Sequence, residues 1–495
     1  MLRKFIKDLA VYAPSQFLPA LTAFITTPIL TRLFAPAEYG WWALTTSIST
    51  FLVALAVSGF GSAVLRFYPA YKTKATLNVF FATISASAGA AILSITFFGC
   101  LVWFVFKPFL PVLLVQYFYL VVLIFIAQSI FSVFIATLRA QGKSAAFTTF
   151  QLLNNYGGLG VGLLLVLLWQ FRVDGLLWGT FIIAVLLLPV LIFVVTKQIG
   201  IHLQYFQLPD ALQIWDFAWP LALGNVAMWG LRVSDLFIIS LFRAEHEVGI
   251  YSVSYNISAK SIELLVSLFM LSISPLVYKI WETEGRQATE KTLTMITRVY
   301  LVFCLPAAVG LSILAFPFIA LLAAPEYYAG SRIVGFVVFS SFIWGLANIA
   351  MMGLTIKKQA RFLAINQILA AAVHIGLQLL FVPRFGYFAS ALSTVIGYSV
   401  LLVLQTLGSR PHLTWKFPFR TLRNTIGASG LMGLVAWGVY GLSGNGSNGS
   451  PVFLLLSILV AVPVYFIVLW LFGEANPEEK QKVFQLLKKT RGGAE

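Results

Sequence analysis

Two pairs of opposite charges stand out because each lies inside a long apolar stretch of the chain. Lys260 is followed three residues later by Glu263, and Arg232 is followed by Asp235 at the same spacing. This spacing places both members of a pair on one face of a helix. Charges in hydrocarbon are costly and therefore indicate a functional site. The cations are suited to bind an anion and the carboxylates a coupling cation, whereas a structural ion pair is the alternative.

Further charged residues and one histidine lie in or at the ends of apolar stretches. Arg298 lies within one stretch, Arg66 ends another, and Arg32 closes the first one. Anchoring at lipid headgroups is the alternative to anion binding for Arg298 and Arg66. His374 is the only histidine deep in such a stretch and is a candidate proton relay, although packing histidines are more common.

Uncharged polar residues in these stretches are candidates for lining a polar path. The residues in question are Asn154, Asn225, Asn256 and Asn366. For each of them, a hydrogen bond between neighbouring helices is the alternative.

Membrane-spanning helices have to position all these side chains. Of the 495 residues, 60% are hydrophobic and 10% are charged, whereas a soluble domain averages roughly 45–50% apolar and about 25% charged. This composition excludes a soluble globular enzyme, and the long apolar runs indicate transmembrane helices. Cys100 and Cys304 both lie in apolar runs, so they predict neither a disulfide framework nor a metal site. No cofactor is expected.

The predicted fold is all-α, with about fourteen transmembrane spans of ~20 residues or more. Their limits are 9–31, 41–65, 77–105, 110–137, 146–169, 175–196, 213–242, 249–278, 293–323, 332–356, 362–382, 387–408, 425–442 and 452–472. Most Lys and Arg residues lie in the termini and in every second loop, which predicts that both termini are cytoplasmic. The net charge of +16 therefore reflects membrane topology and requires no nucleic-acid partner.

Short sequence matches recur along the chain at a nearly constant offset. Residues 38–40 match residues 247–249, and residues 172–175 resemble residues 384–386. We expect two pseudo-symmetric lobes of six spans each and a final helix pair. The predicted boundaries are 1–200, 201–409 and 410–473, with a cytoplasmic tail over 474–495. Transporters built from such parallel repeats bind their substrate at the repeat interface.

A motif between the first two spans points to a family. Residues 31–40 read Thr-Arg-Leu-Phe-Ala-Pro-Ala-Glu-Tyr-Gly. With residues 325–330 and 382–391, this pattern resembles the polysaccharide transporter family of Wzx-type, O-antigen and lipid-linked oligosaccharide flippases. That family belongs to the multidrug/oligosaccharidyl-lipid/polysaccharide exporter superfamily, which includes the MATE transporters. The resemblance extends over nearly the whole chain; one departure is Ala389, where relatives commonly have a second Gly.

The resemblance implies that the protein flips an undecaprenyl-pyrophosphate-linked oligosaccharide. The cargo would pass from the cytoplasmic to the periplasmic leaflet of a bacterial inner membrane by alternating access. It further implies a V-shaped fold whose final helix pair flanks a groove for the lipid tail, and other polysaccharide assembly proteins as partners.

The resemblance also gives the charged residues their expected roles. Candidates for contact with the pyrophosphate or glycan are Lys260, Arg232, Arg298, Arg66 and Arg32. For Arg32, a gate contact with Glu38 is expected before a contact with the cargo. Asp235 and Glu263 are candidates to bind a coupling proton or sodium ion.

Three other functions are alternatives at this point. Cation-coupled drug exporters of the same superfamily usually have fewer spans, whereas a peptidoglycan-precursor flippase has a similar number. A membrane glycan polymerase or ligase would be expected to carry a large periplasmic loop with catalytic residues, and the loops here are short. A transporter rather than an enzyme is therefore expected.

Overall fold

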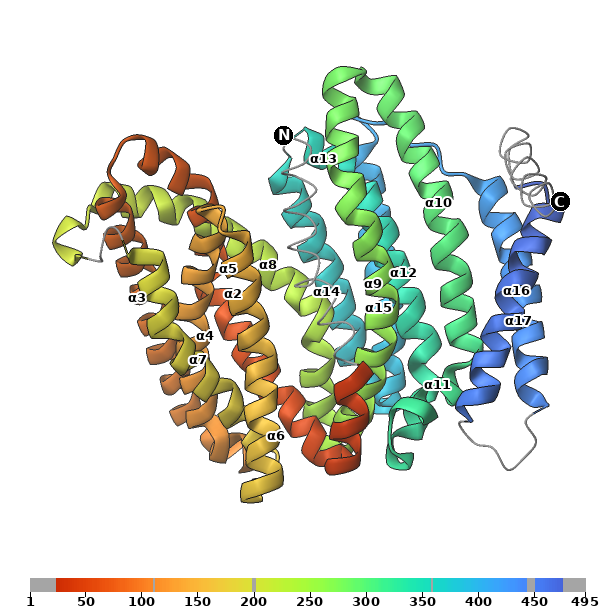
Figure 1. Ribbon diagram of the computed structural model, residues 1–495, viewed down its shortest axis with the longest axis horizontal. Coiled ribbons are helices and arrows are strands. Elements are labelled where there is room, and N and C mark those ends of the chain that lie inside the picture. The colour runs from red at the N-terminus through yellow and green to blue at the C-terminus, as the bar shows by residue number, and fades with distance from the viewer. Residues whose placement is uncertain (1–23, 110–111, 198–201, 358, 443–449, 475–495) are drawn as a thin grey trace, which may run out of the picture. The chain divides into compact units, whose positions relative to one another are not determined.

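The computed structural model describes residues 24–109, 112–197, 202–357, 359–442 and 450–474, which are almost entirely helical (Figure 1). The long helices are α2 (Pro36–Thr73), α3 (Leu77–Phe106), α4 (Val112–Ala140), α7 (Asp174–Thr196), α8 (Leu208–Phe242), α9 (Glu245–Thr283), α10 (Gly285–Ile313), α12 (Val334–Ala350), α14 (Ala360–Phe385), α15 (Tyr387–Ser409), α16 (Phe419–Gly441) and α17 (Pro451–Leu471). The shorter elements are η1 (Lys107–Phe109), α5 (Ser144–Leu152), the π-helical turn η2 (Leu153–Gly157), α6 (Gly158–Trp169), η3 (Leu203–Tyr205), α11 (Ala315–Leu322), η4 (Pro325–Ile333) and α13 (Met352–Ile356).

The described part of the chain contains eleven helices that are long and apolar enough to cross a membrane. Each of them coincides with one of the predicted spans. The predicted spans 249–278 and 425–442 correspond to α9 and α16, which are long helices but are not among those eleven. Most of the predicted span 9–31, and the predicted tail beyond residue 474, lie outside the described residues. The protein is a multi-pass, all-α membrane protein, as predicted.

The helices form two compact units. The first unit contains the described residues up to Val253 together with residues 360–397, and the second contains residues 254–359 and the described residues from Tyr398 onward. Helices α9 and α15 therefore contribute to both units. The lobe boundaries predicted near residues 200 and 409 follow the sequence repeat instead of these contacts, and they stay a prediction.

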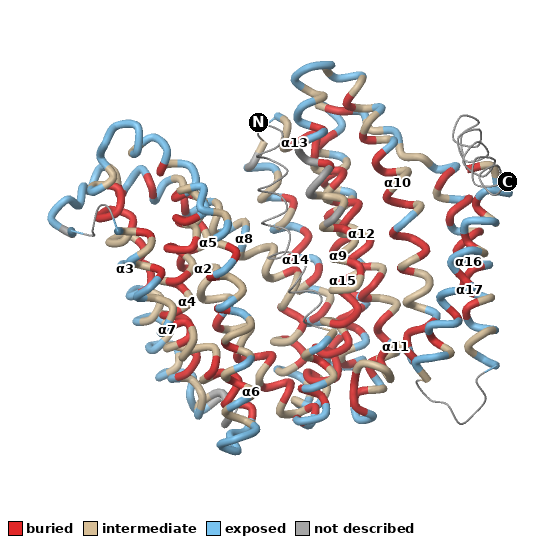
Figure 2. Tube along the Cα trace, viewed as in Figure 1, coloured by how far each residue is buried: buried red, intermediate tan, exposed pale blue. Residues whose placement is uncertain are grey.

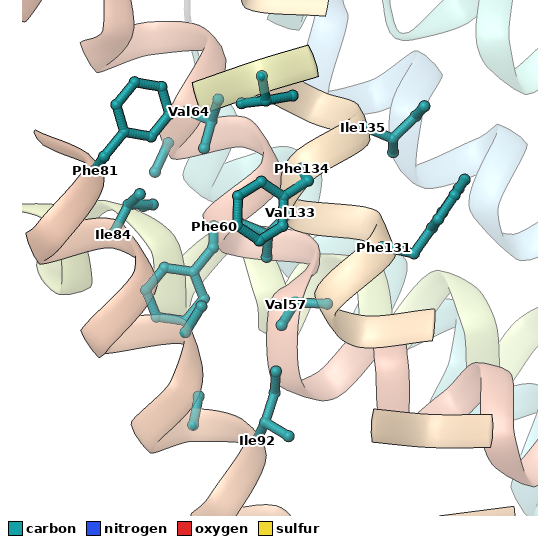
Figure 3. Packing of buried hydrophobic residues seen from close by; sticks show 14 of the residues in the cluster. Val57, Phe60, Val64, Phe81, Ile84, Ile92, Phe131, Val133, Phe134 and Ile135 are labelled. Atoms are coloured by element: carbon teal, nitrogen blue, oxygen red, sulfur yellow. The ribbon is translucent and has the colours of Figure 1, made fainter. Parts of the chain in front are cut away.

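The core of the first unit is built from large apolar side chains of successive helices. Phe60 of α2, Phe81 and Ile84 of α3, and Phe131 and Phe134 of α4 belong to one buried cluster (Figure 3). Interlocking of aromatic and branched side chains fixes how these helices pack. The same cluster includes Ile214 and Ala218 of α8, the helix that carries Asp235.

The outer faces of several helices are apolar as well. Figure 2 shows exposed positions recurring along α3 and α17. On α3, Phe97 and Phe104 are 66% and 76% exposed, and on α17 Leu459 is 69% exposed. Large apolar side chains exposed over a whole helix face are suited to contact lipid instead of water.

The family motif at residues 31–40 covers the end of the preceding helix, a short turn and the start of α2. Ala35 is the N-cap, Pro36 occupies the first turn, and Glu38 Oε2 accepts a hydrogen bond from the Ala35 backbone nitrogen at 3.3 Å. Both residue types are favoured there, because Pro lacks an N–H and a carboxylate faces the positive end of the helix dipole. Gly40 lies one turn further along, where α2 crosses α9.

Gly40 and Gly249 make reciprocal backbone contacts at this crossing. A Cβ atom on Gly40 would overlap the carbonyl oxygen of Glu245 and lie 2.9 Å from the backbone nitrogen of Gly249. A Cβ atom on Gly249 would overlap the carbonyl oxygen of Pro36. Gly40 and Gly249 are equivalent in the sequence repeat, and so are Pro36 and Glu245. A twofold rotation that relates two parallel repeats would exchange these two contacts.

The glutamates of the repeat also have equivalent surroundings. Glu38 forms an ion pair with Arg172 at 3.5 Å, and Glu247 Oε2 accepts from the backbone nitrogen of Tyr387 at 3.4 Å. Arg172 lies in the first of the two matched segments, and Tyr387 directly follows the second. Arg32 donates instead to the carbonyl oxygen of Pro28 at 3.4 Å. In this structure Glu38 thus pairs with Arg172, and the gate contact between Arg32 and Glu38 stays a prediction.

Candidate functional site

Asp235 on α8 is a buried carboxylate, with 1% of its surface exposed. Its Oδ2 accepts a hydrogen bond from the Tyr251 hydroxyl at 2.6 Å, and its Oδ1 accepts from the Ser390 hydroxyl at 2.7 Å. The amide nitrogen of Gln378 donates to the same Oδ1, and the Thr394 hydroxyl lies 3.4 Å from Oδ2. We call the group the Asp235 cluster; it consists of Asp235, Tyr251, His374, Gln378, Ser390 and Thr394.

His374 completes the Asp235 cluster with a ring that is fully buried. Its Nε2 lies 3.4 Å from Asp235 Oδ1 and 2.7 Å from the amide nitrogen of Gln378. Among the described residues, its Nδ1 has no hydrogen-bond partner. A neutral imidazole has one donor and one acceptor nitrogen, and protonation turns both into donors. Asp235 and His374 therefore place an acid and a base side by side among buried groups.

Four helical segments of the first unit hold this cluster: α8, the first turns of α9, α14, and the first half of α15. His374 and Gln378 are four residues apart on α14, as are Ser390 and Thr394 on α15, so each pair lies on one helix face. Gly397 lets α15 come close to α14, because a Cβ atom there would lie 2.9 Å from the Cβ of His374.

The hydrogen bonds of Asp235 make ion binding there depend on helix packing. A buried charge is tolerated only when hydrogen bonds or a partner charge satisfy it. Here the donors come from three segments other than α8. A cation arriving at the carboxylate would displace at least one of them. Cation binding would therefore loosen the contacts of α8 with α9, α14 or α15.

Lys260 lies on the part of α9 that belongs to the second unit. Its Nζ is 2.9 Å from Glu263 Oε2, and the two side chains are 39% and 20% exposed. Lys260 and Glu263 therefore form the structural ion pair that is the alternative to a functional site. Asn256 lies one turn earlier on α9 and is half-buried. Binding of an anion by Lys260 and of a cation by Glu263 stay predictions.

Arg298 on α10 joins the end of α17. Its Nε is 2.9 Å from Glu474 Oε1, and it also donates to the Glu474 carbonyl oxygen. The Glu474 carboxylate is buried and accepts from Asn424 at 2.9 Å and from Thr421, both on α16. This network ties α10 to the final helix pair, so the guanidinium has a structural partner. A role in cargo binding stays a prediction.

The remaining sequence candidates are dispersed over the first unit. The Arg66 guanidinium lies 4.4 Å from the centroid of the Phe217 ring, in a cation–π contact between α2 and α8. Arg232 is half-buried on α8, Asn225 is exposed on the same helix, and Asn366 is buried on α14. None of these four lies among the residues of the Asp235 cluster.

An apolar cavity of about 360 Å³ lies in the second unit, where α10 and α11 meet the final helix pair. Its walls include Pro306 of α10, Phe318 of α11, Met432 of α16 and Tyr465 of α17. In Figure 1, α16 and α17 run beside each other along this part of the chain. Such a surface is suited to a hydrocarbon chain instead of a polar ligand.

The sequence matches the family described as polysaccharide biosynthesis protein over residues 29–332, which is more than half of the chain. The chain belongs to this family. A search of curated protein sequences finds no significant match.

Solved structures show which fold this polysaccharide biosynthesis protein shares. The lipid II flippase MurJ in an inward closed conformation matches with a TM-score of 0.73 and 16% identity, covering 94% of this chain and 98% of that one. An inward-facing multidrug MATE transporter of the MOP superfamily matches with a TM-score of 0.57 and 13% identity, covering 79% of this chain and 97% of that one. The bent form of the Vibrio cholerae MATE transporter VcmN matches with a TM-score of 0.52 and 13% identity, covering 82% of this chain and 98% of that one. These similarities confirm the predicted fold class.

Sequence reasoning named Asp235 and His374 but not the hydroxyl groups around them. Tyr251, Ser390 and Thr394 were missed because hydroxyl residues are frequent in membrane helices and do not stand out singly. One available signal was the four-residue spacing of polar residues in two successive spans, at 374 and 378 and at 390 and 394. This spacing marks polar faces on two neighbouring helices.

Proposed function

We propose that this polysaccharide biosynthesis protein is a flippase for an undecaprenyl-pyrophosphate-linked oligosaccharide, such as an O-antigen or another surface polysaccharide repeat unit. It moves this cargo from the cytoplasmic to the periplasmic leaflet of a bacterial inner membrane by alternating access, with both termini cytoplasmic. Family membership and a fold shared with a lipid II flippase support a lipid-linked cargo. The apolar cavity beside the final helix pair supports it further, because a prenyl tail needs an apolar surface.

The Asp235 cluster is the observation that carries the proposal. A carboxylate sealed among four helical segments is costly for a protein that only needs to be stable. It is useful to a transporter, which has to link ion binding to helix movement. Asp235 is therefore the proposed coupling group, ahead of Glu263, whose carboxylate is engaged by Lys260.

The coupling ion is a proton in this proposal. Hard cations select oxygen ligands, whereas a ring nitrogen and an amide nitrogen lie against Oδ1 of Asp235. A proton needs only one lone pair, and His374 has an unpartnered nitrogen among the described residues. Protonation of the Asp235 carboxylate would displace one of its hydrogen-bond donors and loosen one of the helices that the cluster joins.

Cations for the pyrophosphate are the second requirement of the proposed reaction. The five candidates are Lys260, Arg232, Arg298, Arg66 and Arg32. Lys260 comes first, since it lies within a helix and its side chain is 39% exposed. In this proposal the protein is a transporter and not an enzyme, and other polysaccharide assembly proteins are its partners.

Complementation tests the proposed function. Cells that lack their own oligosaccharide flippase but contain the matching glycan pathway would receive wild type, Asp235→Asn or Asp216→Asn. Asp216 is an exposed carboxylate on the same helix and serves as the matched control. We expect wild type and Asp216→Asn to restore surface glycan, and Asp235→Asn to fail at equal protein abundance.

A peptidoglycan precursor is the second candidate cargo, because the fold is shared with a lipid II flippase over nearly the whole chain. The same plasmids would be tested in cells depleted of their lipid II flippase. Rescue of growth there, without surface glycan in the first strain, would replace the oligosaccharide by the precursor. Failure in both strains, with drug resistance gained, would point to a multidrug exporter.

A further inference from the structure

A second cavity lies inside the first unit and shares no residue with the Asp235 cluster. It has a volume of about 360 Å³ and is lined by α2, α4, η2 and α7. Its polar residues include Thr46, Thr50, Gln128, Asn154, Asn155 and Thr180. The volume falls within the range of about 300–1,000 Å³ that is usual for small-ligand pockets.

The hydroxyl groups of this cavity present lone pairs. Thr46 donates to the carbonyl oxygen of Trp42 at 2.7 Å, and Thr50 donates to that of Thr46 at 2.8 Å. Thr180 donates in the same way to Leu176 at 3.0 Å. Because each hydroxyl proton is used within its own helix, the oxygen lone pairs are left to accept hydrogen bonds from a ligand.

Two amide side chains supply donors to the same cavity. Asn154 Nδ2 lies 3.1 Å from Gln128 Oε1, and Gln128 Nε2 lies 3.4 Å from Asn154 Oδ1. Each amide group has two N–H bonds and two lone pairs. The reciprocal pair therefore orients both groups and leaves each of them a further donor and acceptor.

The π-helical turn η2 brings two consecutive asparagines to the cavity. In an α-helix, neighbouring residues point in directions about 100° apart. The wider turn over Leu153–Gly157 lets both Asn154, which is 7% exposed, and the more exposed Asn155 line the same space. Single π-helical turns inside α-helices are frequent at functional sites.

The chemistry of the walls selects an uncharged polar ligand. None of the described residues that line the cavity carries a charge, so these walls offer nothing to neutralise a pyrophosphate. Polar groups in a membrane protein are costly against lipid and face the bundle interior or water. Acceptors and donors that alternate around an uncharged space match the hydroxyl groups of a sugar ring.

We propose that this cavity binds one sugar of the oligosaccharide cargo and thereby selects the repeat unit. The inference rests on the proposed function, in which the cargo is a lipid-linked oligosaccharide. The glycan would bind between α2, α4, η2 and α7, whereas the charged pyrophosphate would bind elsewhere. Asn154 and Gln128 are then specificity-determining residues.

The test uses the free repeat-unit oligosaccharide, released by mild acid from the lipid-linked pool of the cells that carry the gene. This probe has neither lipid nor phosphate. Its binding to the purified full-length protein in nanodiscs would be measured by saturation-transfer NMR and titration. We expect Asn154→Leu and Thr50→Val to weaken binding about three- to tenfold, as loss of one or two uncharged hydrogen bonds implies.

Thr96→Val is the matched control. Thr96 on α3 makes the same kind of hydrogen bond to its own helix, at 2.8 Å from the carbonyl oxygen of Ile92, but lies outside the cavity. It should leave the dissociation constant unchanged. Thermal unfolding of each variant identifies folding defects. If Asn154→Leu fails to fold, Thr50→Val still tests sugar binding, because Thr50 is at an exposed position.

Two outcomes would overturn the inference without touching the proposed function. The first is equal binding of the oligosaccharide by wild type and both cavity variants. The second is no binding by wild type although vesicles containing the protein still translocate the intact lipid-linked oligosaccharide. If neither binding nor translocation is found, the proposed function fails as well.

Discussion

Gly40 and Gly249 face each other at the crossing of α2 and α9, with no side chain between the two backbones. The two glycines occupy equivalent positions in the two halves of the sequence repeat. Each is required because the carbonyl oxygen of the opposite helix start, at Glu245 or Pro36, fills the space a Cβ would need. The weak sequence matches around residues 38–40 and 247–249 thus lie where the two backbones contact each other.

Gly249→Ala should destabilise the protein. The added methyl group overlaps backbone that cannot rotate away, and overpacking of this kind typically costs about 1–3 kcal/mol. Thermal unfolding in detergent would measure the change. Gly89→Ala on α3 is the control, because nothing lies within 4 Å of a Cβ there. A melting temperature for Gly249→Ala equal to that of the control would contradict the close crossing.

Tyr251→Phe should destabilise the first unit by more than an ordinary tyrosine hydrogen bond. The lost hydroxyl donates to the buried Asp235 carboxylate at 2.6 Å, and hydrogen bonds to charged groups contribute about 1.5–3 kcal/mol. Tyr300→Phe removes a bond to the neutral carbonyl of Phe342 at 2.8 Å and should cost about 0.5–1.5 kcal/mol. Chemical denaturation measures the free energy of unfolding of both variants. An equal loss of unfolding free energy in the two variants would argue for an uncharged Asp235.

Asp235→Asn should uncouple transport from the proton gradient. The amide preserves the shape of the carboxylate but cannot take up a proton. In vesicles loaded with lipid-linked oligosaccharide, wild type should translocate faster when a pH gradient is imposed, whereas the variant should not respond. Asp216→Asn serves as the control on the same helix. A wild-type response to sodium alone, at constant pH, would assign the coupling to sodium.

Lys260 and Glu263 can be separated by a double substitution. If Lys260 binds the pyrophosphate, Lys260→Gln lowers translocation about tenfold or more, Lys260→Arg retains most of it, and adding Glu263→Gln does not restore it. If Lys260 only neutralises Glu263, the double variant recovers, because no unpaired carboxylate is left. Initial rates of translocation at equal protein density distinguish the two results.

Arg298→Met should loosen the final helix pair. The variant leaves the buried Glu474 carboxylate without its guanidinium. Removing one partner of a fully buried pair costs about 3–5 kcal/mol, and the cost here is smaller since the Arg298 side chain is 27% exposed. Hydrogen exchange should increase in α16 and α17. Arg298→Met combined with Glu474→Met should recover part of the lost protection against hydrogen exchange. Unchanged protection of α16 and α17 in the single variant would exclude a role of Arg298 in anchoring the final helix pair.

The membrane spans were predictable from sequence because apolar runs of this length are rare outside membrane helices. Hydropathy placed eleven spans that the structure contains in its described part. It also predicted the spans that correspond to α9 and α16, although Lys260 and Glu263 make α9 less apolar. The contact units were not predictable, because which helices pack together depends on side-chain shape instead of average composition.

The site was predictable only as separate residues. Asp235 and His374 could be singled out because charged residues and histidines are rare within spans. Whether the two side chains come into contact depends on how α8 and α14 are rotated about their axes. The same holds for Asn154, whose partner Gln128 lies on α4. For Arg298 the sequence suggested an anchor at the headgroups, and its partner Glu474 follows a different span.

If Asp235 is the coupling group, its single carboxylate limits how much work one transport cycle can draw from the membrane through protons. If one proton accompanies each cargo, a membrane potential of 100 mV supplies about 2.3 kcal/mol. That energy sustains a roughly 40-fold difference in cargo density between the leaflets, at about 1.4 kcal/mol for each factor of ten. Any steeper difference would have to come from the negative charge of the pyrophosphate, which the same potential drives outward, from the pH gradient, or from enzymes that consume the oligosaccharide after it has been flipped.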